Sequence, residues 1–184
     1  CLGGCYSIKI VTHLELPTSP PLSVSTKVGI GKCEITPPAG YPMGGNSVEA
    51  HFGMGVWNRL YARSIYLEDT AGTPIIMVSC DLWSVSSGFC DKIVEEVQKK
   101  HPYIGRKNVI IAATHTHQSP GNFSSNSLYN MMAQNLPGFD QELFDFLVRS
   151  VVTAIDQSIR NAEPAKIFES TTQTKNISRN RSYS

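Results

Sequence analysis

Cysteine is scarce in this sequence, and its positions are scattered. The 184 residues contain five cysteines, namely Cys1, Cys5, Cys33, Cys80 and Cys90. They are too few and too widely spaced for the disulfide framework of a small secreted domain. We expect Cys80 and Cys90 to be buried side chains that behave as small apolar groups. The chain must therefore fold around a hydrophobic core.

Net charge and long apolar runs are also lacking. The 16 Lys and Arg residues nearly balance the 15 Asp and Glu residues, so the formal net charge is +1. This balance gives no electrostatic basis for binding nucleic acid or an anionic membrane surface. No apolar stretch reaches the roughly 18 residues that a transmembrane helix needs. The composition thus argues against a nucleic-acid partner and against a transmembrane segment.

The sequence does have enough apolar material for one core. Apolar residues make up 41% of the chain, and a chain of this length suits one domain or one part of a larger domain. Residues 1–26 contain Pro17, Pro20 and Pro21, which exclude regular helix and predict an extended lead-in. Residues 27–184 are predicted to form the folded domain.

Two short motifs bear on the compartment. Asn122, Asn176 and Asn180 each begin a triplet of the N-glycosylation type, which favours a secreted glycoprotein, extracellular or associated with a membrane surface. The sequence LGGC at residues 2–5 faintly resembles the cleavage box of bacterial lipoproteins. That second motif would instead favour a bacterial lipoprotein or a periplasmic protein.

Hydrophobic periodicity predicts both strands and helices. Alternating or continuous apolar runs predict strands at 27–36, 59–69, 74–82, 108–114 and 165–171. Apolar residues at helical spacing predict helices at 85–100, with Ser84 or Ser86 as N-cap, and at 141–161. The strand at 74–82, the helix at 85–100 and the strand at 108–114 form a βαβ unit with parallel strands. The predicted fold class is α/β, a mixed sheet with a βαβ unit and flanking helices.

Two histidines follow the last strand of this unit. Side chains alternate along an extended segment, so His115 and His117 are expected to point the same way and to offer two imidazoles to one metal ion or substrate. Parallel strands end at the same edge of a sheet, so Asp81 is expected nearby, where its carboxylate could orient a histidine. Two ordinary roles remain open: the histidines cap a strand, and Asp81 caps the following helix.

The chain ends in a polar segment, NISRNRSYS, at residues 176–184. Arg179 and Arg181 in this segment could hold an anionic or polarised oxygen. The alternative is a solvated tail without a binding role.

Five segments together resemble the neutral (non-lysosomal) ceramidase family and its bacterial relatives. In chain order they are VGIGKCEITPPAGYPMGG, GVWNRLYARSIYLED, MVSCDLWSV, NVIIAATHTHQSPGNF and NISRNRSYS. The family pattern around the histidines is Thr-His-Thr-His-Ser-Gly-Pro-Gly. This chain departs from it at Gln118 and Ser119, which stand where serine and glycine are usual.

The resemblance implies a fold, an activity and residue roles. Family members have an α/β catalytic domain and are zinc amidases that cleave the N-acyl bond of ceramide. By resemblance His115 is a zinc ligand, and His117 is a catalytic residue that faces the substrate and the reacting oxygen. Arg181 matches the active-site arginine, with Arg179 in its place if the register shifts. Asp81 is expected to support the site.

The resemblance also implies that this chain is the N-terminal part of a larger catalytic domain. The other zinc ligands of the family, a second His, a Glu and a Tyr, would lie on the C-terminal remainder of the enzyme, possibly carried as a second chain. Two other hypotheses remain. One is a non-catalytic ceramidase-derived domain that binds lipid or a partner. The other is an unrelated metal hydrolase, against which the lack of repeated βα units argues.

Overall fold

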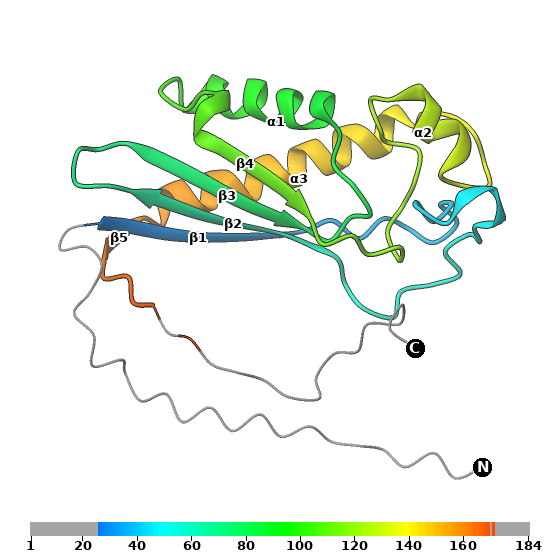
Figure 1. Ribbon diagram of the computed structural model, residues 1–184, viewed down its shortest axis with the longest axis horizontal. Helices are drawn as coiled ribbons and strands as arrows, with labels where there is room; N and C mark the ends of the chain where they lie inside the picture. Colours follow the sequence, from blue (N-terminus) through cyan, green and yellow to red (C-terminus); the bar gives the residue numbers. More distant parts are fainter. Residues whose placement is uncertain (1–25, 170, 172–184) are drawn as a thin grey trace, which may run out of the picture. The chain divides into compact units, whose positions relative to one another are not determined.

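The computed structural model describes residues 26–169 and 171, and a five-stranded sheet organises them (Figure 1). The strand order is β4-β3-β2-β1-β5. The strands are β1 (Thr26–Glu34), β2 (Tyr61–Glu68), β3 (Pro74–Cys80), β4 (Val109–Ala113) and β5 (Glu163–Ala165). Strands β1, β2 and β3 form an antiparallel meander, whereas β4 pairs with β3 in parallel. The sheet is therefore mixed, as the sequence predicts.

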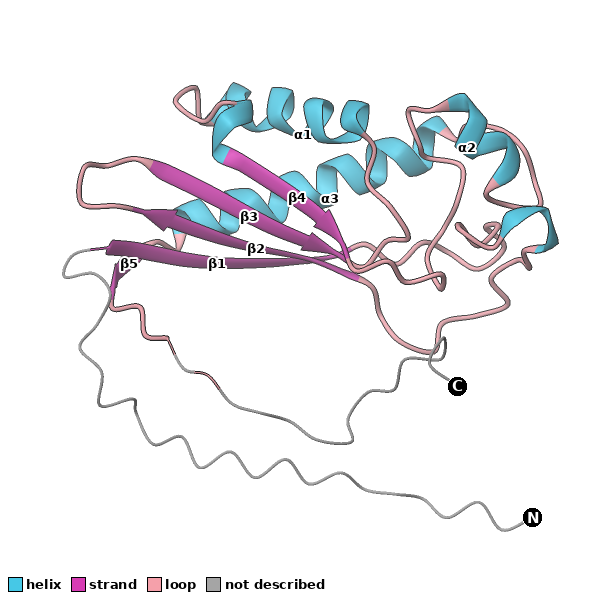
Figure 2. Cartoon of the chain, in the orientation of Figure 1, coloured by secondary structure: helices cyan, strands magenta, loops and turns pink. Residues whose placement is uncertain are grey.

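Two long helices cover one face of this sheet (Figure 2). Helix α1 (Ser87–Lys100) connects β3 to β4 and completes the predicted βαβ unit. Helix α3 (Gln141–Arg160) packs on β1 and β2 and lies beside α1. Asp140 is the N-cap of α3, and its side chain accepts a hydrogen bond from Leu143 N at 2.9 Å, the usual way to satisfy a free amide in the first turn. The short helix α2 (Ser127–Met132) and two 3₁₀ turns, η1 (Ser47–Glu49) and η2 (Arg106–Asn108), lie in the connecting segments.

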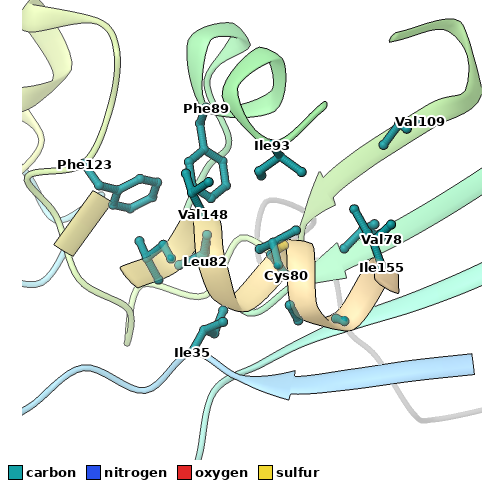
Figure 3. Packing of buried hydrophobic residues seen from close by; sticks show 14 of the residues in the cluster. Ile35, Val78, Cys80, Leu82, Phe89, Ile93, Val109, Phe123, Val148 and Ile155 are labelled. Atoms are coloured by element: carbon teal, nitrogen blue, oxygen red, sulfur yellow. The ribbon is translucent and has the colours of Figure 1, made fainter. Parts of the chain in front are cut away.

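The hydrophobic core lies between the sheet and these helices (Figure 3). Phe89 of α1 stacks edge to face on Phe123 and on Phe144 of α3, with ring centroids 5.6 and 5.7 Å apart. Cys80 and Cys90 are buried, as predicted, and burial raises the pKa of the Cys80 thiol to about 12. The Cys80 thiol is therefore a packing group and not a nucleophile.

Among the described residues, none of the helices has the length and the apolar character of a membrane-spanning segment.

Strand β1 lies unusually close to α3 because glycines face the helix. A Cβ added at Gly29 would lie 1.9 Å from the carbonyl oxygen of Ser158, and one at Gly31 would lie 1.9 Å from that of Ala154. The hydroxyl groups of Ser64 and Ser158 are 2.8 Å apart in the same buried interface. The contact between sheet and helix thus depends on small residues on both sides.

The last strand of the sheet is shorter than predicted and begins earlier in the sequence. The sequence predicts it at 165–171, but β5 comprises Glu163–Ala165 and pairs antiparallel with the start of β1. Pro164 lies within this strand, which is tolerated because β5 is at the edge of the sheet and a proline has no N–H to donate. Residues 166–169 and 171 belong to a separate unit and contain no helix or strand. Residues 1–25 of the predicted lead-in lie outside the described residues.

Asn122 differs from its sequence-based interpretation. Asn122 is 7% exposed and donates from its amide to the carbonyls of Leu136 and Gly138, so it is not available to a glycan in this fold. His101 directly follows α1, and its Nε2 lies 3.0 Å from the carboxylate of Asp156 in α3. The other two triplets, at Asn176 and Asn180, lie outside the described residues.

We expect the free energy of unfolding to depend on the ionisation of the Asp156 carboxyl, and therefore on pH. The hydrogen bond from His101, helped by Lys100 and Arg160, holds the pKa of this carboxyl below its usual value of 3.8. A carboxyl with a depressed folded-state pKa stabilises the fold above its unfolded-state pKa, and that stabilisation is lost as the pH falls through the folded-state pKa. Asp156→Asn should therefore lower the free energy of unfolding at neutral pH, and its difference from the parent should shrink in acid.

Urea unfolding at neutral and acidic pH checks this prediction. Asp91→Asn is the matched control, because the side chain of Asp91 is 65% exposed and its only recorded ion pair, among the described residues, is with Arg106. We expect the control to change stability little at either pH. The loss in the free energy of unfolding caused by Asp156→Asn should become smaller in acid. A loss that stays constant or grows on acidification contradicts the role given to this carboxylate.

Candidate functional site

The site is built where β3 and β4 end side by side. The parallel ladder continues for one bond beyond the strands, from Thr114 N to the carbonyl oxygen of Cys80 at 2.9 Å. The next residue, His115, then leaves the sheet with a positive φ of 62°. This left-handed conformation is uncommon for a residue with a side chain and is a typical place for functional strain.

The ring of His115 is oriented by the backbone of the neighbouring segment. Its Nδ1 lies 2.6 Å from the carbonyl oxygen of Trp83. Because a carbonyl can only accept, Nδ1 carries the proton in the neutral ring, and Nε2 keeps its lone pair. Trp83 is itself fixed, since its N–H donates to the Ser119 hydroxyl at 2.8 Å. His115 is therefore an exposed imidazole with a defined tautomer, as metal-ligating histidines require.

His117 is oriented by Asn46. The amide Nδ2 of Asn46 donates to the His117 carbonyl at 3.2 Å, so its Oδ1 faces the ring, 3.2 Å from His117 Nδ1. An amide oxygen only accepts, which places the ring proton on Nδ1. Asn46 thus fixes both the backbone and the tautomer of His117.

The two imidazoles converge. Their Nε2 atoms are 3.5 Å apart, and the rings meet nearly at right angles, with centroids 4.9 Å apart. The predicted convergence is therefore present, but its cause is the left-handed turn at His115 and not an extended segment. Two nitrogen ligands of one tetrahedral zinc lie about 3.4 Å apart, given Zn–N bonds of about 2.0–2.1 Å. The donor atoms thus suit a metal ion, and they equally suit a proton shared between the rings.

Asp81 does not orient either histidine. Its carboxylate accepts from Tyr61 N at 2.9 Å and from the Arg63 guanidinium at 2.9 Å. These bonds hold β2 to the end of β3, because Tyr61 begins β2 and Asp81 follows β3. The orienting groups, Trp83 and Asn46, have no sequence signal of this role: Asn46 is 71 positions from His117, and Trp83 acts through its backbone. Ser86, and not Asp81, takes the N-cap position of α1, although its side chain does not cap the helix.

Glycines let the loop that carries Asn46 approach the site. A Cβ at Gly44 would lie 2.2 Å from the Trp83 ring, and one at Gly45 would lie 3.1 Å from His117 Nε2. Ser119, which stands where the family pattern has glycine, bridges the site: its hydroxyl donates to the Thr116 carbonyl at 3.0 Å and accepts from Trp83 N. That departure from the pattern is therefore explained by local hydrogen bonding.

A cleft of about 520 Å³ opens beside the histidines. Its lining includes Asp81, Thr114 and Thr116, together with the aromatic residues Tyr41 and Trp57. Gln118 also faces this cleft, while neither histidine belongs to its described lining. The histidine pair and the cleft thus share the segment 114–118 and use alternate side chains of it.

The predicted site is incomplete within the described residues. Arg179 and Arg181 lie outside them. Nowhere in residues 26–169 and 171 do three His, Cys, Asp or Glu side chains gather closely enough to hold a metal ion. His115 therefore fits one ligand position, and the described residues do not supply a full set.

Removing the Asn46 side chain should change the preferred tautomer of the His117 ring. In Asn46→Ala the Nδ1 proton loses its acceptor, so we expect the neutral ring to shift towards the Nε2–H form, which is favoured in free histidine. Long-range ¹H–¹⁵N NMR spectra of the ring nitrogens distinguish the two forms. His115 is the internal control, because the Trp83 carbonyl still holds it. An unchanged His117 tautomer in this variant contradicts the role of Asn46.

Comparisons with known proteins agree with this architecture. The family model described as "Neutral/alkaline non-lysosomal ceramidase, N-terminal" matches residues 26–184. The neutral ceramidase of Pseudomonas aeruginosa is 31% identical over 160 residues, which are 85% of this chain and 23% of that protein. The neutral ceramidase of Drosophila melanogaster is 30% identical over 163 residues, 88% of this chain and 23% of that protein.

Solved structures give the same result. The crystal structure of the Pseudomonas aeruginosa neutral ceramidase superposes with a TM-score of 0.70 at 30% identity, over 77% of this chain and 22% of that one. A ceramidase structure described as complexed with C2 gives a TM-score of 0.69 over the same shares. This chain thus spans less than a quarter of the length of these relatives. It belongs to the neutral/alkaline non-lysosomal ceramidase family and corresponds to the N-terminal part of its members.

Proposed function

We propose that this chain is part of a zinc-dependent amide hydrolase of the neutral ceramidase type. The reaction is hydrolysis of the N-acyl bond of ceramide or a related N-acylated compound. The observation that carries the proposal is the His115–His117 pair, whose Nε2 atoms lie 3.5 Å apart while both Nδ1 atoms are held by acceptors. Such a pair at the carboxyl ends of two parallel strands, in a chain of this family, favours hydrolytic chemistry over a purely structural role.

His115 would hold the zinc ion through Nε2. Zinc, when bound, supplies a Lewis acid that polarises the acyl carbonyl and lowers the pKa of water. The contribution of the protein is orientation: the Trp83 carbonyl keeps the proton on Nδ1 of His115, so that the ligating nitrogen is always free. Ser119 keeps that carbonyl in place through its bond to Trp83 N.

His117 would move the proton in the reaction. Its Nε2 faces the same point as that of His115 and can take up a proton and return it to the leaving amine nitrogen. Arg181 would stabilise the negative charge that develops on the acyl oxygen, with Arg179 in that role if the register shifts. Asp81 would support the site indirectly, through its bonds to Tyr61 and Arg63.

The proposal includes a partner. The remaining zinc ligands would come from the C-terminal remainder of the same enzyme, as a continuous polypeptide or as a second chain, because this chain spans only 23% of its curated relatives. By itself the chain should not catalyse. We place the activity outside the cell or at a membrane surface, in line with the Asn176 and Asn180 triplets.

Product analysis tests the reaction directly. The polypeptide encoded by the full reading frame is incubated with ceramide that carries an isotope in its acyl chain, and mass spectrometry detects labelled fatty acid and free sphingosine. A matched N-acylated amine without the sphingoid chain shows whether the lipid is needed. Hydrolysis of either amide supports the proposal, and the two rates define the substrate class. Lipid binding without release of either product would leave a non-catalytic lipid-binding domain as the better account.

A further inference from the structure

The sheet has a second face, and apolar side chains form a row across it. The strand registers place Ile30 opposite Ile65, Ile65 opposite Met77, and Met77 opposite Ile110. These four side chains point away from α1 and α3, and they are 66%, 39%, 40% and 56% exposed in the same order. The row crosses four strands without a polar interruption.

A second row lies next to the first. Val28 pairs with Leu67, and Leu67 pairs with Ile75, which is 45% exposed. Beyond the first row, towards the site, the same face becomes polar, with Lys32 opposite Arg63 and Arg63 opposite Ser79. We call the seven residues of the two apolar rows the open apolar face: Val28, Ile30, Ile65, Leu67, Ile75, Met77 and Ile110.

The sequence of β3 shows that this face is not adapted to water. A strand with one solvated face alternates apolar and polar residues, whereas a strand buried on both faces is apolar throughout. In β3 the helix-facing residues include Ile76 and Val78, and the opposite residues include Ile75 and Met77. The parallel pairing of β3 and β4 supports the same conclusion, because parallel strands are nearly always covered on both faces.

We infer that the C-terminal remainder of the enzyme packs an apolar layer onto the open apolar face. The remainder is the favoured occupant because the match covers only 22–23% of the relatives' length, which leaves most of such a protein outside this chain. A contiguous apolar surface of this kind marks an interface in a folded protein. The polar band with Lys32 and Arg63 then lies between this interface and the histidines. The inference rests on the proposed function only in requiring the longer polypeptide.

Packing on this face also positions the missing ligands. The open apolar face includes residues of β3 and β4, the strands whose carboxyl ends are followed by Asp81 and His115. A layer fixed on those strands is held in register with the histidine pair, as a precise metal site requires. The interface and the site would therefore be assembled together.

Cysteine labelling in the full-length polypeptide tests whether the face is covered. Met77→Cys is compared with Gln98→Cys, an exposed position on α1 away from the open apolar face. A water-soluble maleimide is added, and mass spectrometry follows each peptide separately, so the natural cysteines do not interfere. We expect Met77→Cys to react about 100-fold more slowly than Gln98→Cys, because labelling requires local opening. Equal rates in the native protein, with equal rates in denaturant, overturn the inference.

Photo-crosslinking in the same polypeptide identifies what covers the face. Benzoylphenylalanine replaces Ile110, which lies on the edge strand β4 and is 56% exposed. Crosslinked peptides from beyond residue 184 support the inference. Crosslinks to a second copy of this chain, or to its residues 1–25, overturn it. Zinc content and ceramide hydrolysis of the same preparation are measured separately, so a covered face without activity refutes the proposed function alone.

Discussion

Replacing His117 by glutamine should lower kcat for amide hydrolysis by about a hundredfold to ten-thousandfold, the usual contribution of a positioned acid–base group. Glutamine can fill the space and still contact Asn46, but its amide cannot take up and return a proton. In the proposed mechanism the imidazole of His117 does so, because its Nδ1 is held and its Nε2 lies 3.5 Å from that of His115. Bound zinc should remain, because His115 keeps its own orienting bond to Trp83.

The matched control is His51→Gln. The ring of His51 is exposed, and the hydrogen bond recorded for this residue uses its backbone carbonyl, which accepts from Met43 N. We expect this variant to keep its activity. The assay is carried out on the full-length polypeptide, with kcat, KM and zinc content measured together. A His117→Gln enzyme with unchanged kcat removes His117 from the mechanism, whereas loss of zinc in this variant would make His117 a ligand.

The second large effect is expected at the contact between β1 and α3. In Gly31→Val the new Cβ would lie 1.9 Å from the Ala154 carbonyl oxygen and 2.8 Å from Ser158 N. Both neighbours are backbone atoms on the buried side of α3, so only a displacement of α3 or β1 relieves the clash. We expect a loss of about 3 kcal/mol or more in the free energy of unfolding, at the upper end of overpacking effects. A loss of this size is a large fraction of the total stability of a marginally stable domain.

Gly55→Val is the control for that prediction. A Cβ at Gly55 meets no atom within 4 Å, so the same substitution adds the same side chain without a clash. Urea unfolding followed by circular dichroism measures both variants. Comparable stability of Gly31→Val and Gly55→Val would show that the sheet and helix can separate at little cost, which contradicts the close packing described here.

The parts of the fold that the sequence predicts well are those with long periodic patterns. The β3-α1-β4 unit and helix α3 have apolar residues at the right spacing, and their observed ends differ by only a few residues from the predicted ones. Strand β5 is different, because it has three residues and pairs with β1, which is far away in the sequence. A strand this short has no periodicity to detect, and its position depends on where α3 ends.

The site shows the same division between local and distant information. The sequence locates His115 and His117 after a buried strand, and the structure brings their rings together. It does not reveal Asn46 or the Trp83 carbonyl, since the first contact joins a distant loop and the second involves a backbone atom. The burial of Asn122 is hidden for a similar reason: its amide bonds to carbonyls 14 and 16 positions away. Side-chain partners between loops are set by tertiary packing.

The central claim is that His115 holds a catalytic zinc ion. Elemental analysis of the full-length polypeptide, compared with His115→Asn, tests it most directly. Asparagine tolerates the left-handed backbone at this position better than alanine does, so the fold should be kept while the imidazole is lost. We predict about one zinc per chain in the parent protein and a large loss of zinc in His115→Asn. A parent protein without zinc, or a His115→Asn variant that retains it in full, would contradict the account.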